Sequence, residues 1–228
     1  MIIDSVKKEG APDLPGRIQE EGAGEGRVRP VSAGTLPEGE GAPAAEGAVR
    51  VLETILARRS YRGTYVQAPV PREHLKAIME AGLAAPSGCN RQTTSLIAVD
   101  DRELLRRIRE VIDPPVCETA PALICVLTRR INAYRDRCFA VQDYSAAIEN
   151  MLLAITALGY RSCWYEGHIT DADRIADRIA AILGVPGDME LVCILPVGIA
   201  REVPCAPRKL AFSQRAWFNG CPERDGER

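Results

Sequence analysis

The stretch Pro86-Ser87-Gly88-Cys89-Asn90-Arg91-Gln92 is a polar loop, and the apolar run Leu96-Ile97-Ala98-Val99 follows almost at once. The apolar run predicts a strand, while the hydroxyl and amide groups of the loop can bind the edge of a flat heterocycle. Upstream lies Arg58-Arg59-Ser60-Tyr61-Arg62, which gathers three guanidiniums and a hydroxyl. Guanidiniums donate bidentate hydrogen bonds to phosphate oxygens, and serine adds a neutral donor. Together the two segments predict a site for a small phosphorylated ligand with a planar ring.

Helical and strand patterns alternate along the rest of the chain. Apolar residues at helical spacing predict a helix that ends near the arginine cluster. Further helices are predicted at 71–85, from about 102 to Pro114, at 140–158 with Gly159 as its cap, and from Thr170 to about Leu183. Strands are predicted at 95–99, 121–128, 162–165 and 191–199. This alternation indicates a mixed α and β domain.

The composition excludes several classes of protein. The net charge is only −2, so no overall field attracts nucleic acid or an anionic membrane. The eight cysteines contain no C-x-x-C pair and the two histidines stand apart, which indicates neither a disulfide framework nor a metal site. No apolar run reaches the roughly eighteen residues that span a bilayer, and the first residues lack the apolar core of a signal peptide. We expect a reduced, cytoplasmic protein.

Two regions differ in composition. Residues 1–48 contain no aromatic side chain and are rich in Gly, Pro and Glu, so they bury too little surface to fold alone and are expected to form a flexible tail. Residues 49–228 are expected to form one domain that ends in an arm at about 205–228. The aromatic side chains of this arm are too large to leave in water.

The order and content of these segments resemble the FMN-dependent nitroreductase family over about residues 50–220. The resemblance implies an α+β three-layer sandwich, in which helices flank a central, mostly antiparallel sheet, and a homodimer with FMN at the interface. It also implies contacts to the FMN phosphate and ribityl chain from a segment that matches Arg58, Arg59, Ser60 and Arg62. A lone arginine pair at the end of a helix is more commonly solvated and favoured there by the helix dipole. The additional match of the loop at 86–92 favours a ligand site.

The resemblance assigns further cofactor contacts. Pro86, Ser87 and Asn90 match a loop that the partner subunit places against the isoalloxazine. Backbone N–H groups near Glu166 and Gly167 match donors to flavin N5 and O4. Arg208 and Lys209 resemble a second phosphate contact, although such a pair is usually solvated.

Two features qualify the match. Thr93-Thr94 departs from the Pro-aromatic pair common in the family, which bears on substrate preference. Residues 134–139 match a variable lid, where Arg135 or Arg137 could lie near the flavin; an ordinary charged segment before a helix is the alternative.

The implied function is two-electron reduction of nitroaromatics, quinones or related acceptors by a ping-pong route, with NADH or NADPH as a transient donor and flavin N5 carrying the hydride. No catalytic side chain is required. Two alternatives stay open: other flavin chemistry on the same fold, such as reductive dehalogenation or flavin fragmentation, and a flavin-binding or redox-sensing protein without turnover.

Overall fold

A computed structural model describes residues 46–204 and 206–221. The expected tail lies outside the described residues as far as Ala45, and the described chain begins with helix α1 (Glu46–Ala57). The last part of the expected arm, residues 222–228, also lies outside them. The division of the chain at residues 48 and 49 stays a prediction.

A three-stranded antiparallel sheet forms the centre of the domain, in the order β1 (Thr94–Val99), β2 (Ala122–Thr128) and β5 (Glu190–Val197). All seven residues of β2 are buried. The apolar run at 121–128 predicts a strand covered on both faces, and this is confirmed.

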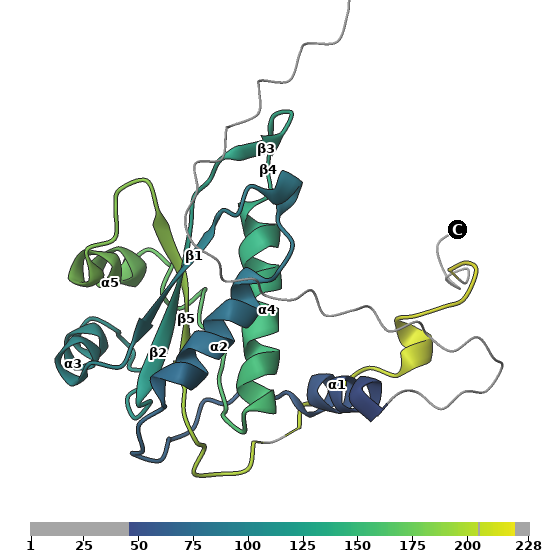
Figure 1. Cartoon of the computed structure of the whole chain (residues 1–228), viewed down its shortest axis with the longest axis horizontal. Helices are drawn as coiled ribbons and strands as arrows, with labels where there is room; N and C mark the ends of the chain where they lie inside the picture. The colour runs from purple at the N-terminus through teal and green to yellow at the C-terminus, as the bar shows by residue number, and fades with distance from the viewer. Residues whose placement is uncertain (1–45, 205, 222–228) are drawn as a thin grey trace, which may run out of the picture. The chain divides into compact units, whose positions relative to one another are not determined.

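Two helical layers cover the sheet. Helices α2 (Arg72–Leu83) and α4 (Ala140–Ala157) lie on one face, and α3 (Arg102–Glu110) and α5 (Ile175–Leu183) lie on the other (Figure 1). Alternate residues of β2 feed separate cores: Ile124 packs with the α2–α4 layer and Cys125 with the α3–α5 layer. The expected α+β three-layer arrangement with an antiparallel sheet is therefore confirmed.

Several helix ends follow simple local chemistry. The Asp101 side chain accepts hydrogen bonds from the backbone N–H groups of Glu103 and Leu104, which begins α3. Gly159 follows α4 with a φ of +84°, a conformation that favours glycine, as expected for the end of the longest helix.

Two predicted elements are wrong in part. The helix expected from Thr170 begins only at Ile175, because both the N–H and the hydroxyl of Thr170 bind the carbonyl of Glu166 and close a separate turn. The strand expected at 162–165 forms isolated bridges instead, between Ser60 and Ser162 and between Tyr165 and Ile194.

The smaller elements lie outside the central sheet. A hairpin of β3 (Asn132–Tyr134) and β4 (Arg137–Cys138) precedes α4. Short 3-10 turns occur at η1 (Gly88–Asn90) and η2 (Phe212–Gln214). Among the described residues, none of the helices combines the length and the hydropathy that crossing a bilayer requires.

Candidate functional site

The basic segment at the exit of α1 has its guanidiniums in three different settings. Arg58 forms an ion pair with Glu149 of α4, with 3.3 Å between Nε and Oε1. The Nη1 of Arg59 donates to the carbonyls of Leu56 and Arg58, so this side chain caps its own helix. Arg62 is exposed. The predicted binding of a phosphate by Arg58, Arg59 and Arg62 stays a prediction.

The same segment is fixed to residues 162 and 163. The N–H of Tyr61 donates to the carbonyl of Ser162 at 2.8 Å, next to the bridge between Ser60 and Ser162. Burial raises the pKa of the Cys163 thiol, while Arg62, a hydrogen bond with Ser60 and Arg58 act to lower it. Arg58, Ser60 and Arg62 thus all act on the Cys163 thiol, and their joint role in binding a phosphate stays a prediction.

The segment that follows Cys163 ends in two free backbone donors. Within the described chain, the N–H groups of Glu166 and Gly167 make no hydrogen bond to protein. A methyl group at Gly167 would meet no atom within 4 Å, so the surrounding space is open. Donors of this kind can bind an acceptor on a ligand without adding a group that titrates.

Two neutral donors hold the carboxylate of Glu166. The phenol of Tyr144 donates to Oε1 and the indole Nε1 of Trp164 donates to Oε2, each at 2.7 Å. Tyr144 is buried, and burial, with the hydrogen bond to Glu166, raises its pKa to about 12. The phenol therefore stays protonated and remains a donor at neutral pH.

A cavity of about 350 Å³ opens beside Glu166. Its walls include Arg130, which pairs with Glu190 at 2.7 Å, together with the backbone turn at Thr170 and the buried residues Leu191 and Val192. The cavity gives a small molecule room beside Glu166.

The polar loop has an unusual backbone. Cys89, Asn90 and Gln92 have φ values of 49°, 53° and 48°, in the left-handed region that non-glycine residues rarely adopt. The Ser87 hydroxyl accepts the N–H of Gln92 at 2.9 Å. Asp143, on the first turn of α4, accepts the N–H of Gly88 at 2.8 Å and the hydroxyl of Thr93 at 2.7 Å. Strained loops of this kind persist only where their surroundings hold them, and they are common at ligand sites.

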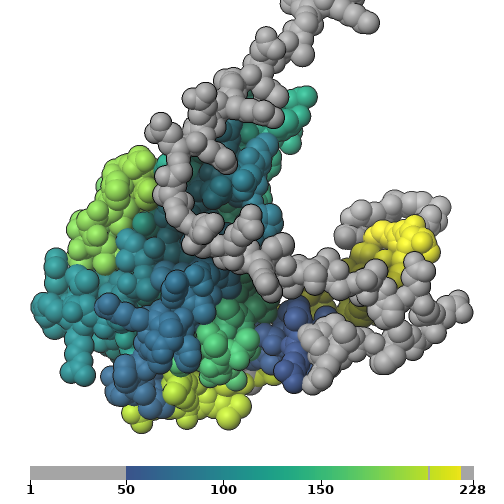
Figure 2. Space-filling model, viewed as in Figure 1, coloured from purple at the N-terminus to yellow at the C-terminus, as the bar shows by residue number. Residues whose placement is uncertain are grey.

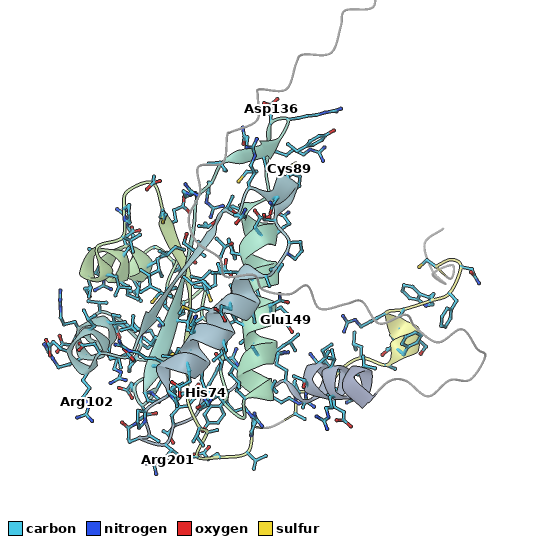
Figure 3. All side chains as sticks on the ribbon, viewed as in Figure 1. His74, Cys89, Arg102, Asp136, Glu149 and Arg201 are labelled. Carbon is cyan, nitrogen blue, oxygen red and sulfur yellow. The ribbon has the colours of Figure 1, made fainter. Side chains whose placement is uncertain are left out.

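One chain does not bring the loop and the basic segment together. Figure 3 shows Cys89 of the loop near the start of α4, whereas Glu149, the partner of Arg58, lies further along that helix toward α1. Within a protomer, Cys89 of the loop therefore lies away from Glu149 and from the guanidinium that pairs with it, that of Arg58. The expectation that this loop serves the other subunit's site fits the separation and stays a prediction.

The remaining predicted residues lie on exposed segments. Arg208 and Lys209 are exposed and form no described ion pair or side-chain hydrogen bond. Arg135 occupies the turn of the β3–β4 hairpin with a φ of 49°, and its guanidinium lies 5.2 Å from the ring centroid of Tyr134. Arg137 is exposed. Nothing in these contacts ties the three arginines or Lys209 to a shared site.

Two residues of the site, Asp143 and Tyr144, were not predicted from the sequence as functional. A signal for Asp143 was present. Ala147 and Met151 follow it at intervals of four residues and are both buried. This spacing places the carboxylate on the buried face of α4. An acidic residue at such a position needs hydrogen-bond donors from elsewhere in the fold.

Comparison with known proteins gives consistent matches. The family model described as Nitroreductase family matches residues 55–114 and 111–199. A relative from Methanothermobacter thermautotrophicus, provisionally named NADH dehydrogenase/NAD(P)H nitroreductase, is 32% identical over 155 residues, which are 68% of this chain and 79% of the relative.

Two solved structures share the fold over most of their length. A nitroreductase with bound FMN from Bacteroides fragilis is 30% identical, with a TM-score of 0.62, over 75% of this chain and 98% of the other. An FMN-dependent nitroreductase from Clostridium difficile is 26% identical, with a TM-score of 0.63, over 75% of this chain and 99% of the other.

Proposed function

Because this chain belongs to the nitroreductase family, we propose that it is an FMN-dependent oxidoreductase that takes electrons from NADH or NADPH and passes them to a small electrophilic acceptor. Nitroaromatics, quinones and related compounds are the proposed acceptors. The homodimer and the cytoplasmic location belong to the same proposal.

The observation that carries the proposal is the layout of residues 162–167. At one end, Ser60 forms a bridge with Ser162, and the proposed phosphate-binding group of Arg58, Arg59, Ser60 and Arg62 includes this serine. At the other end are the free N–H groups of Glu166 and Gly167. An extended segment of this length spans roughly 16 Å, which suits a ligand with a phosphate at one end and a ring with hydrogen-bond acceptors at the other.

The charges of the basic segment fit a flavin phosphate. A phosphate monoester carries about −1.5 to −2 charges at neutral pH. The guanidiniums of Arg58 and Arg62 balance this charge, and Ser60 adds a neutral donor. Arg208 and Lys209 of the arm are proposed as additional phosphate contacts, and Pro86, Ser87 and Asn90 as contacts to the ring from the partner subunit.

FMN, when bound, supplies a ring nitrogen, N5, that accepts a hydride from the nicotinamide and later gives it to the acceptor. The residues of this chain bind FMN and orient its ring. The N–H groups of Glu166 and Gly167 donate to the ring edge, and Tyr144 and Trp164 keep the Glu166 segment in place. The cavity of about 350 Å³ beside Glu166 offers room for a second small molecule.

Exposed apolar surface supports the homodimer. Leu56 of α1 is 72% exposed and Phe218 of the arm is 84% exposed, together with other apolar residues of both segments. The surface of α1 adjoins that of α4 (Figure 2), and an apolar groove of about 550 Å³ runs between α1, α2 and α4. Contiguous exposed apolar surface commonly marks an interface between proteins. We propose that a second copy of the chain covers this surface and the groove.

The test uses full-length protein. We expect yellow protein whose heat-released ligand is FMN by mass spectrometry, whose colour NADH or NADPH bleaches without oxygen, and whose colour returns on adding a quinone or a nitroaromatic. The double variant Arg58→Ala with Arg62→Ala should be folded and colourless. Arg102→Ala with Arg107→Ala, two exposed arginines on α3, removes the same charge and should stay yellow.

Other results would redirect the proposal. Stoichiometric flavin in the Arg58 and Arg62 double variant would place the phosphate elsewhere. Bound FMN that neither nicotinamide bleaches would favour a flavin-binding protein without turnover. Bleaching without transfer to nitro or quinone acceptors would favour other flavin chemistry on this fold.

A further inference from the structure

The loop at 86–92 is held in a conformation that its own sequence does not favour. Three non-glycine residues within four positions, Cys89, Asn90 and Gln92, occupy the left-handed region. The loop also lies close to the start of α4, because a Cβ at Gly88 would come within 2.9 Å of the Phe139 side chain. Such a backbone requires contacts from outside the loop to keep it in one state.

Asp143 provides those contacts on both sides of the strained residues. Its Oδ1 accepts the N–H of Gly88, which precedes them, and its Oδ2 accepts the hydroxyl of Thr93, which follows them. Asp143 is only 4% exposed, and Thr93 is buried as well. One carboxylate thus ties the two ends of the loop to a rigid helix.

We propose that Asp143 is a positioning residue for the flavin-lining loop, and that it acts on the flavin bound by the other subunit. This inference rests on the proposed function. It assigns Asp143 no contact with flavin or substrate. Its effect passes through Ser87 and Asn90, whose placement depends on the loop conformation that Asp143 holds.

Substitutions at the two ends of this contact separate positioning from charge. Asp143→Asn keeps the shape: its Oδ1 can accept from Gly88, and its Nδ2 can donate to the Thr93 hydroxyl, which accepts as well as donates. We expect near wild-type FMN affinity in this variant. Asp143→Ala loses both hydrogen bonds, and the dissociation constant for FMN should rise about ten-fold or more. Thr93→Val removes only one of them and should give an intermediate value.

Readouts of the bound state distinguish this role from general stability. The visible circular dichroism of bound FMN and the acceptor KM should change in Asp143→Ala and return toward wild type in Asp143→Asn. Asp188→Ala, at an exposed turn, controls for loss of an aspartate and should change neither. If Asp143→Ala does not fold, the comparison of Thr93→Val with Asp143→Asn decides the question.

A mixed dimer tests action across the interface. One tagged chain carries Asp143→Ala, and the other carries Arg58→Ala with Arg62→Ala. If the loop serves the partner, one of the two sites in the mixed dimer combines an intact loop with an intact phosphate site. At an FMN concentration between the dissociation constants of wild type and Asp143→Ala, flavin content should then approach one per mixed dimer and exceed that of either parent. Flavin no higher than the mean of the parents would overturn action between subunits.

The outcomes also separate this inference from the proposed function. Wild-type protein that binds no FMN would refute the proposed function. Wild-type protein that binds FMN, with folded Asp143→Ala showing the same affinity, KM and visible spectrum, would refute the role of Asp143 alone.

Discussion

The phenol of Tyr144 donates a 2.7 Å hydrogen bond to Oε1 of Glu166, which joins α4 to the segment that carries the free N–H groups of Glu166 and Gly167. Trp164 holds the other carboxylate oxygen. The position of the two backbone donors therefore depends on the packing of α4 against the sheet.

Tyr144→Phe should weaken FMN binding roughly ten-fold, because a hydrogen bond to a carboxylate is lost and the Glu166 segment gains freedom. Titration of apoprotein with FMN, followed by flavin fluorescence, measures the change. Tyr160→Phe, which loses a hydrogen bond to His74 instead, is the matched control and should bind as wild type. Equal affinities in the two variants would show that the phenol does not support the site.

The same phenol gives a defined pH dependence. Burial and the hydrogen bond to Glu166 raise the pKa of Tyr144 from 10 to about 12. Since the folded-state pKa is the higher one, the protonated phenol stabilises the fold fully below pH 10, and this contribution is lost as the pH rises through 12. The free energy of unfolding in urea should fall more steeply for wild type than for Tyr144→Phe across this range. Parallel curves would contradict the assignment.

If Arg58 binds the FMN phosphate as proposed, Glu149 competes with that phosphate for its guanidinium. The ion pair has 3.3 Å between Nε and Oε1, and it is partly exposed, so it contributes at most about 1 kcal/mol. Glu149→Gln should tighten FMN binding by up to about five-fold. Glu80→Gln breaks the exposed pair with Lys76 on α2 and should have no effect. Weaker binding in Glu149→Gln would mean that Glu149 instead holds Arg58 in place.

Cysteine reactivity should follow burial. Cys89, Cys138 and Cys221 are exposed, whereas Cys125 is fully buried and burial raises its pKa to about 12. Iodoacetamide at neutral pH should modify the exposed cysteines first, as peptide mass spectrometry measures, and Cys125 only after denaturation. Labelling of Cys125 in the native protein at the rate of Cys89 would contradict the fold at β2.

Gly198 lies where the chain leaves β5 and has no room for a side chain. A Cβ there would lie 2.7 Å from Cδ of Pro121 and 2.8 Å from the Tyr65 ring. Both neighbours are rigid, so Gly198→Ala should lower the free energy of unfolding by about 1–3 kcal/mol. Gly187→Ala, which would meet nothing within 4 Å, should be neutral. Unfolding in denaturant measures the free energy of unfolding of both variants. Equal free energies would contradict the tight packing at Gly198.

Parts of the fold could be predicted because their signals are local. The buried run of β2 and the apolar periodicity of α4 lie within single elements, and both elements are present. The start of α5 could not be predicted, because Thr170 binds the carbonyl of Glu166 in a separate turn. The spacing of apolar residues before the arginine cluster predicts a helix, and α1 is present. Leu56 and its apolar neighbours are nevertheless exposed in a single chain.

The sequence by itself determined most of the helical and extended segments, and that a compact group of arginines lies at the end of the first helix. Periodicity and local charge act over a few residues and need no knowledge of the remaining fold. Tertiary structure alone decided which groups hold the site together. Asp143 reaches Gly88 across 55 positions and Tyr144 reaches Glu166 across 22. These hydrogen bonds exist only because α4 packs on the sheet, and a buried carboxylate obtains its donors from whichever elements that packing brings near.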